Sequence, residues 1–205
     1  MNQHKPLRLL AATLLIAAAN GAAQAKDFDN LLRGDYAFSG EGSCLVSRGG
    51  FNRDLTPAGP PASFPFITSF SVQGVRTFNG DGTGKVVARV LVISHPFALP
   101  TSPALFNRGS ASSSDILVDF TYEVASDRTI TLDAVSFTGT TLTGNEAGQT
   151  FFVTNFPRFS GRISQDHRTL TIAHSEPTIE TIQFSDGDIH HRICQRSRIL
   201  LEQKD

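Results

Sequence analysis

The chain has 205 residues, of which 40% are hydrophobic and 18% charged, with 18 lysines and arginines against 19 aspartates and glutamates. This length predicts one domain or two small ones, and the near-cancelling charges exclude the basic surface that is typical of nucleic-acid-binding proteins. Two cysteines are too few for a disulfide-dense scaffold or a cysteine-rich zinc module, and no glycine-rich nucleotide-binding motif occurs.

The first 25 residues have the pattern of a secretory signal peptide. Lys5 and Arg8 precede an apolar run at 9–19, and the segment Ala23 to Ala25 has the small-x-small pattern that signal peptidase cleaves. The apolar run is shorter than the roughly 20 residues that span a bilayer, which disfavours a membrane anchor. We therefore expect export by a Sec-type signal to the periplasm or the medium, with residues 26–205 forming one domain that has no membrane span.

Export changes the interpretation of the two cysteines. Cys44 and Cys194 lie near opposite ends of the mature chain. In an oxidising compartment such a pair persists as a disulfide. A reactive thiol or a metal ligand is the alternative, but neither cysteine has neighbours at the usual spacing for such a site. The sequence therefore predicts a disulfide that joins the two ends of the fold.

The mature chain is dominated by alternation of polar and apolar residues, which predicts β-strands. Gly34 ends a short helical segment expected at 27–33. Polar turns such as Asn79–Gly82 and Asp186–Gly187 predict antiparallel neighbours, and the long connections 47–65 and 95–114 are expected at the rim. The expected strands are 35–39, 67–78, 85–94, 116–125, 129–137, 150–154, 159–164, 169–174, 178–184 and 189–200.

We expect an all-β fold, an antiparallel up-and-down β-barrel of about eight to ten strands, although closure as a sandwich stays open. The helical segment followed by Gly34, Asp35 and Tyr36 resembles the opening of the lipocalins, in which a short helix precedes a Gly-x-Trp motif. In that family a basic residue near the last strand covers the tryptophan, and Arg192, Arg196 or Arg198 is the candidate here. The resemblance implies a barrel with a cavity for a small apolar ligand.

The last hairpin supplies the candidate site residues. If Asp186 and Gly187 form a two-residue loop, Ser185 lies opposite Asp188, and this register places Glu180 and His191 on one face. If the preceding strand has the same facing, His174 joins them inside. Two imidazoles and a carboxylate can hold a metal or transfer a proton, and hydrogen-bonded or rim-exposed residues are the alternative.

The same register creates a conflict for the predicted disulfide. It places Cys194 on the outer face with His190 and Arg192, whereas Cys44 has the parity of the inward-facing Tyr36. A β-bulge at 40–42 would turn the first strand over and resolve the conflict.

The leading functional hypothesis is binding of a small hydrophobic molecule, since all 16 phenylalanines lie in the mature chain and suit an apolar interior. The alternatives are an envelope or surface protein that acts through protein partners, and a barrel enzyme, such as a cyclase or isomerase, that uses His174, Glu180 and His191. No cofactor, metal or nucleic acid is expected, and the oligomeric state is not predicted.

Overall fold

The computed structural model describes residues 28–59, 65–99 and 102–204, so the predicted signal peptide lies outside the described residues. Ten strands form one antiparallel sheet, which confirms the all-β, antiparallel part of the predicted fold class, and two short strands form a separate hairpin. The sheet contains β1 (Arg33–Ser47), β2 (Phe66–Asn79), β3 (Thr83–Ser94), β6 (Ser110–Val124), β7 (Thr129–Thr143), β8 (Thr150–Thr154), β9 (Phe159–Ile163), β10 (Thr169–His174), β11 (Ile179–Phe184) and β12 (Ile189–Glu202), and the hairpin contains β4 (Phe97–Leu99) and β5 (Ser102–Asn107).

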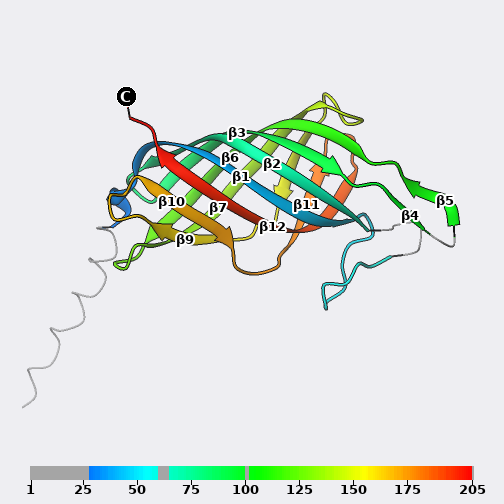
Figure 1. Ribbon diagram of the computed structural model, residues 1–205, viewed down its shortest axis with the longest axis horizontal. Helices are drawn as coiled ribbons and strands as arrows, with labels where there is room; N and C mark the ends of the chain where they lie inside the picture. Colours follow the sequence, from blue (N-terminus) through cyan, green and yellow to red (C-terminus); the bar gives the residue numbers. More distant parts are fainter. Residues whose placement is uncertain (1–27, 60–64, 100–101, 205) are drawn as a thin grey trace, which may run out of the picture.

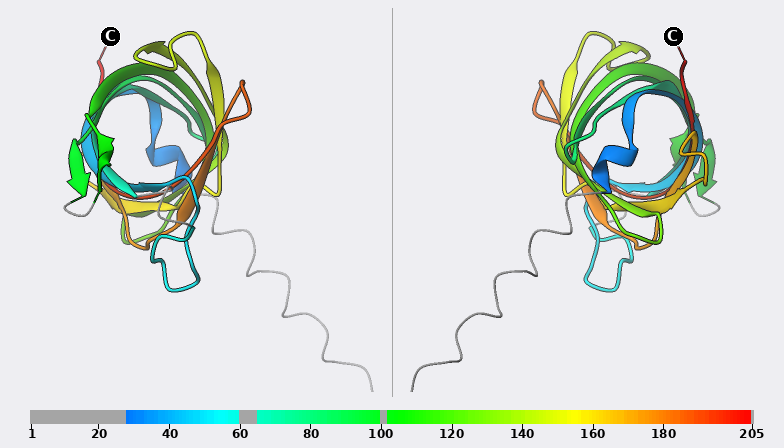
Figure 2. Two further views of the ribbon diagram at one scale, coloured as in Figure 1. Left: turned by 90° about the vertical axis from the view of Figure 1, so that its right-hand side faces the viewer. Right: turned by 90° about the vertical axis from the view of Figure 1, so that its left-hand side faces the viewer.

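The sheet closes on itself because β1 pairs with both β2 and β12 (Figures 1 and 2). The long strands β1, β2, β3, β6 and β7 are neighbours in that order. Between β7 and β12 the wall consists of two short pairs, β8 with β11 and β9 with β10. The ring is therefore not an even barrel, since one side is assembled from half-length strands.

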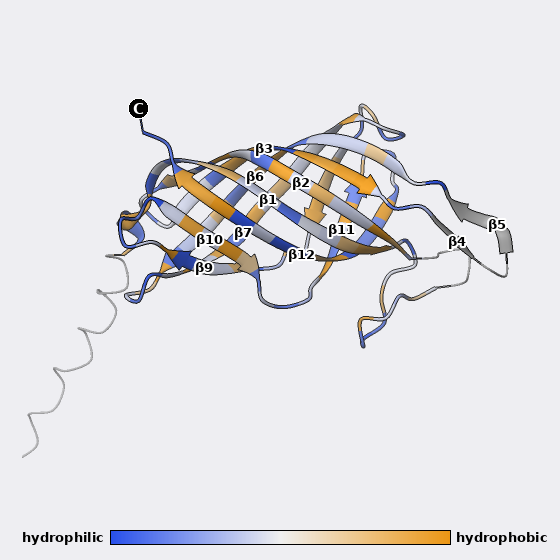
Figure 3. Ribbon diagram, in the orientation of Figure 1, coloured by the Kyte–Doolittle hydropathy of each residue, from blue (hydrophilic) through white to orange (hydrophobic). Residues whose placement is uncertain are grey.

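The expected alternation is visible along the strands (Figure 3). In β6, Val118, Phe120 and Tyr122 are buried and the residues between them are not. This strand begins at Ser110, earlier than expected, so part of the predicted 95–114 loop belongs to the sheet wall. In the described part of the chain, no helix has the length and apolar character needed to span a membrane.

The predicted helix at 27–33 is wrong. The described part of this segment contains a single 3-10 turn, η1 (Asp29–Leu31), before the chain enters β1. The Tyr122 hydroxyl donates to the carbonyls of Asp29 and Leu32 at 2.9 and 3.1 Å, and the Val124 amide donates to the Asp29 carboxylate at 2.8 Å. The carbonyl groups of Asp29 and Leu32, which a helix would use for its own hydrogen bonds, thus accept hydrogen bonds from a side chain of β6. Tertiary contacts override the local helix propensity here.

Aromatic side chains fill the end of the ring beside η1. Phe78 packs edge-on against Tyr36 and Tyr122, with ring centroids 5.3 and 5.0 Å apart, and Leu32 is completely buried with them. The Tyr36 hydroxyl donates to the carbonyl of His167 at 3.0 Å. No arginine stacks on Tyr36 in the part of the chain that the structure describes. The ring of Phe78, and not a basic side chain, therefore packs against Tyr36 in the described part of the chain.

The predicted disulfide is confirmed. Cys44 and Cys194 are directly opposite each other in the β1–β12 ladder and are bonded. Both side chains are buried on the inner face, and the ladder runs from Tyr36 to Ser47 without a shift in register. The expected bulge at 40–42 is thus wrong, and the disulfide ties the first strand of the ring to the last.

Gly40 and Gly42 have a different role from the expected bulge. They lie at inward-facing positions of β1, where a Cβ atom would come within 2.4 Å of the Arg198 side chain and of the Phe70 ring, respectively. Because these glycines have no side chain, the side chains of Arg198 on β12 and Phe70 on β2 have room to lie against β1 inside the ring.

Candidate functional site

The last hairpin differs by one residue from the expected register. Phe184 lies opposite Asp188, since its amide donates to the Asp188 carbonyl at 2.9 Å and its carbonyl accepts from Gly187 at 3.0 Å. The loop therefore has three residues, with Gly187 at φ +92°, and not two. A shift of one residue exchanges the two faces of a strand, so β12 directs His190, Arg192 and Cys194 inward and His191 outward.

The interior contains a cavity of about 440 Å³. This volume lies within the range of about 300–1,000 Å³ that is common for small-molecule sites. The lining is mainly apolar and comes from most strands of the ring, with Phe38, Val72 and Phe120 at its inner part. The aromatic cluster below them closes one end, whereas Arg48 and Glu146 lie at the loop-bearing mouth.

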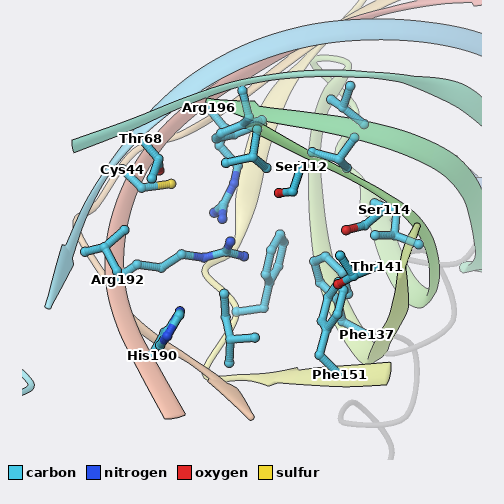
Figure 4. A pocket seen from close by; sticks show the side chains of 18 of the residues that line it. Cys44, Thr68, Ser112, Ser114, Phe137, Thr141, Phe151, His190, Arg192 and Arg196 are labelled. Carbon is cyan, nitrogen blue, oxygen red and sulfur yellow. The ribbon is translucent and has the colours of Figure 1, made fainter. Parts of the chain in front are cut away.

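Four arginines line the interior of this cavity, namely Arg76 from β2 and Arg192, Arg196 and Arg198 from β12. Arg192 and Arg196 point into the cavity from one wall, and the hydroxyl groups of Ser112, Ser114 and Thr141 lie across it on β6 and β7 (Figure 4). The cavity thus combines an apolar lining with a wall of positive charge and a facing wall of hydroxyl groups.

Glu180 on β11 is the acidic partner of two of these arginines. It is completely buried, and its Oε2 atom accepts hydrogen bonds from Arg196 Nη2 at 2.7 Å and from Arg192 Nε at 2.9 Å, while Arg196 also bonds Oε1. Burial raises the pKa of Glu180, but the charges and hydrogen bonds of the two arginines outweigh it and lower the pKa to about 2. Glu180 is therefore a fixed carboxylate, unsuited to donating a proton near neutral pH.

The candidate acid–base group of His174, Glu180 and His191 is not assembled. His191 lies on the outer face, where its Nδ1 atom is 3.1 Å from the Thr181 hydroxyl. His174 ends β10 and packs between Phe159 and Phe156, with ring centroids 4.0 and 5.7 Å away, and it does not line the cavity. Of the three residues, His174 and Glu180 are on the inner side of the wall. The predicted inward facing of His191 is wrong.

The position of His174 affects its titration. Burial, and then the positive charge of Arg196, lower the pKa of His174 from 6.5 to about 4, against the opposing effect of Glu180. As the pH falls, the His174 imidazole is therefore protonated in the unfolded chain before it is protonated in the folded chain. The free energy of unfolding should fall as the pH falls from about 6.5 to about 4. Replacing His174 with phenylalanine should flatten this part of the curve of melting temperature against pH.

Thermal unfolding followed by circular dichroism across this pH range measures the effect. His95→Gln is the matched control, because His95 is exposed and contacts Ser69. Equal slopes for the wild type and the His174→Phe variant would contradict the assignment.

One group at the mouth has donor atoms close enough together for a metal. Oxygen or nitrogen atoms of Glu146, Asp188 and His190 lie within 4.8 Å of one another. Asp188 is already bonded to His190 at 3.0 Å and to Arg48 at 3.2 Å. These contacts make the group a network of polar and charged side chains at the rim, with no feature that demands a cation.

The inward-facing arginines were missed because the hairpin register was off by one residue. A signal was present, since Cys194, Arg192, Arg196 and Arg198 share one parity. A disulfide to an inward-facing Cys44 requires that parity to point inward, which would have placed all three arginines inside. Arg76 was also detectable, because it alternates with Val72 and Phe78 along its strand.

Comparison with protein-family models, with curated proteins and with solved structures found no match. The lipocalin resemblance therefore stays a prediction.

Proposed function

We propose that this chain is an exported, lipocalin-like barrel protein that binds a small, mainly apolar molecule in the central cavity. The observation that carries the proposal is the cavity of about 440 Å³ inside a closed sheet, lined mainly by apolar side chains. A protein core is normally packed with few voids larger than a water molecule. An apolar space of this size is better suited to a ligand than to stabilising the fold.

Export is supported by the disulfide, because such bonds persist in oxidising compartments. The enzyme alternative has less support. Both oxygens of Glu180 are bonded to arginines and His191 faces outward, so two of the three candidate residues are not free to act on a molecule in the cavity. Binding therefore accounts for more of the interior than acid–base chemistry does.

Titration with a neutral apolar fluorophore such as N-phenylnaphthylamine tests the proposal. The wild type should enhance the fluorescence saturably, and saturating ligand should raise the melting temperature, since binding at about 100 times the Kd adds about 2.7 kcal/mol of stability. Native mass spectrometry should show one ligand per chain.

The strand β3 offers a matched pair of variants. Val90 points into the cavity and Val87 is 55% exposed on the outer face of the same strand. Val90→Trp should fill the cavity and abolish the fluorescence enhancement, whereas Val87→Trp should bind like the wild type. No binding by the wild type, or equal binding by the two variants, would overturn the proposal.

A further inference from the structure

Arg76 lies at the inner end of the cavity, where two of its nitrogen atoms have no hydrogen-bond partner among the described residues. It is paired with Tyr36 in the β1–β2 ladder, two pairs away from the buried Phe78. Only 8% of it is exposed, and its Nε and Nη1 atoms are buried without an acceptor among the described residues. Its guanidinium carbon lies 4.7 Å from the centre of the Phe120 ring. The ring partly compensates the charge, but the N–H donors stay unpaired.

The other three interior arginines are better satisfied. Arg192 and Arg196 share the carboxylate of Glu180. Arg198 donates to the carbonyl oxygens of Ser197 and Glu41 at 2.7 and 3.2 Å. Among the described residues, the carboxylate of Glu180 is the only buried acidic group that faces these four cations, so the interior has a surplus of positive charge. Arg76 is its least satisfied member.

An unpaired buried charge is costly, because water is removed and nothing replaces its hydrogen bonds. Burial lowers the pKa of Arg76 to about 10, and burial together with the charges of Arg196 and Arg76 lowers the pKa of Arg198 to about 9. Both guanidinium groups remain protonated at neutral pH. A bound anion would compensate this charge and supply acceptors for the free N–H groups of Arg76.

We infer that the ligand is an amphiphile whose compact oxyanionic head group is bound at the inner end of the cavity by Arg76, with Arg198 nearby, while its apolar body extends towards the mouth. The inference rests on the proposed function, and it names the ligand class. The neighbours of Arg76 inside the cavity are apolar, namely Phe38, Phe120 and the ladder partner Val86, so a neutral polar head would find few partners there. Arg192 and Arg196, in contrast, already share the carboxylate of Glu180 as a hydrogen-bond acceptor.

Binding of matched dodecyl compounds to the complete mature protein tests the inference by isothermal titration calorimetry. Dodecanoate should bind about ten- to a hundredfold more tightly than dodecanol, as expected for a buried charge-assisted hydrogen bond, and dodecylamine should bind least. Dodecyl sulfate and dodecyl phosphate, each titrated below its critical micelle concentration, rank the possible head groups.

The variant Arg76→Met keeps the bulk of the side chain and removes its charge. It should bind dodecanol as the wild type does but lose the preference for dodecanoate. Arg89→Met is the matched control, because Arg89 forms an exposed ion pair with Asp115 on the outer face; this variant should retain the preference. Without ligand, Arg76→Met should melt at a higher temperature than the wild type, since it removes an unpaired buried charge.

The outcomes separate the two proposals. If the wild type binds dodecanol and dodecanoate equally, or if Arg76→Met keeps the preference, the head-group inference is overturned while the apolar cavity site stands. If inorganic phosphate alone raises the melting temperature as much as dodecanoate at equal concentration, the site is an anion site without a role for the apolar body, and the inference also fails. If no dodecyl compound and no neutral fluorophore binds, the proposed function itself is wrong.

Discussion

Replacing Glu180 with glutamine should lower the free energy of unfolding by about 3–5 kcal/mol, the usual cost of removing one partner from a buried ion pair. Glutamine keeps the shape of the side chain, so the loss reports the charge and not the packing. Arg192 and Arg196 would then share a neutral amide, with the Arg196 side chain only 4% exposed. No other carboxylate among the described residues is bonded to either guanidinium.

Urea unfolding of the variant and the wild type measures this effect. Glu123→Gln, which changes an exposed glutamate on β6, should be nearly neutral. The double variant Glu180→Gln with Arg196→Met should lose less stability than the sum of the two single variants, because the second change removes a charge that the first leaves unpaired. Additive losses would show that the three side chains do not act as a unit.

The same carboxylate predicts a dependence on acid. Because the pKa of Glu180 is depressed from 4.5 to about 2 in the folded protein, its contribution is complete above the unfolded value and is lost as the pH falls towards about 2. The Glu180→Gln variant should lack this component. Its range lies below that of His174, so the two contributions are separable in one pH series.

Removing the disulfide should have an effect of similar size. The bond joins residues 150 positions apart, and closing a loop of this length is worth about 5 kcal/mol in the chain-entropy model. The Cys44→Ala, Cys194→Ala double variant should therefore unfold at a much lower urea concentration than the oxidised wild type.

Reduced wild-type protein provides the comparison for side-chain loss, because it keeps both sulfur atoms without the bond. The reduced wild type should unfold at the same urea concentration as the double variant. Dithiothreitol should lower the urea midpoint of the wild type and leave that of the double variant unchanged. Equal midpoints for oxidised and reduced protein would mean that the β1–β12 ladder holds without its covalent link.

Much of the fold was predictable because strand alternation is a local property of the sequence. The expected segments correspond to the ten strands of the sheet, and the expectation of export together with two cysteines was sufficient to predict the disulfide. The absence of the expected helix at 27–33 could not be predicted from local sequence. Its carbonyl groups accept hydrogen bonds from the hydroxyl of Tyr122, which is about ninety residues away in the chain. Nor does local pattern indicate that two short strand pairs complete one side of the ring.

The site was less predictable, because the length of one turn decided which side chains of β12 point into the interior. Asp186 and Gly187 fit both a two-residue and a three-residue loop, and that choice decides whether His191 or His190 and Arg192 face the interior. His174 and Glu180 were correctly placed on the inner side, but the partners of Glu180 were not. Distant pairing, and not turn chemistry, settles the facing here, since Cys194 has to meet Cys44.

The aromatic floor formed by Tyr36, Phe78 and Tyr122 makes the cavity blind-ended. A ligand that binds in this cavity would therefore enter and leave by the same route. Under the proposed function, a ligand would pass the rim residues Arg48, Glu146 and His190 both on binding and on release. Substitutions there should alter the rates of association and release together and leave the equilibrium affinity nearly unchanged, a kinetic signature that an open-ended channel would not have.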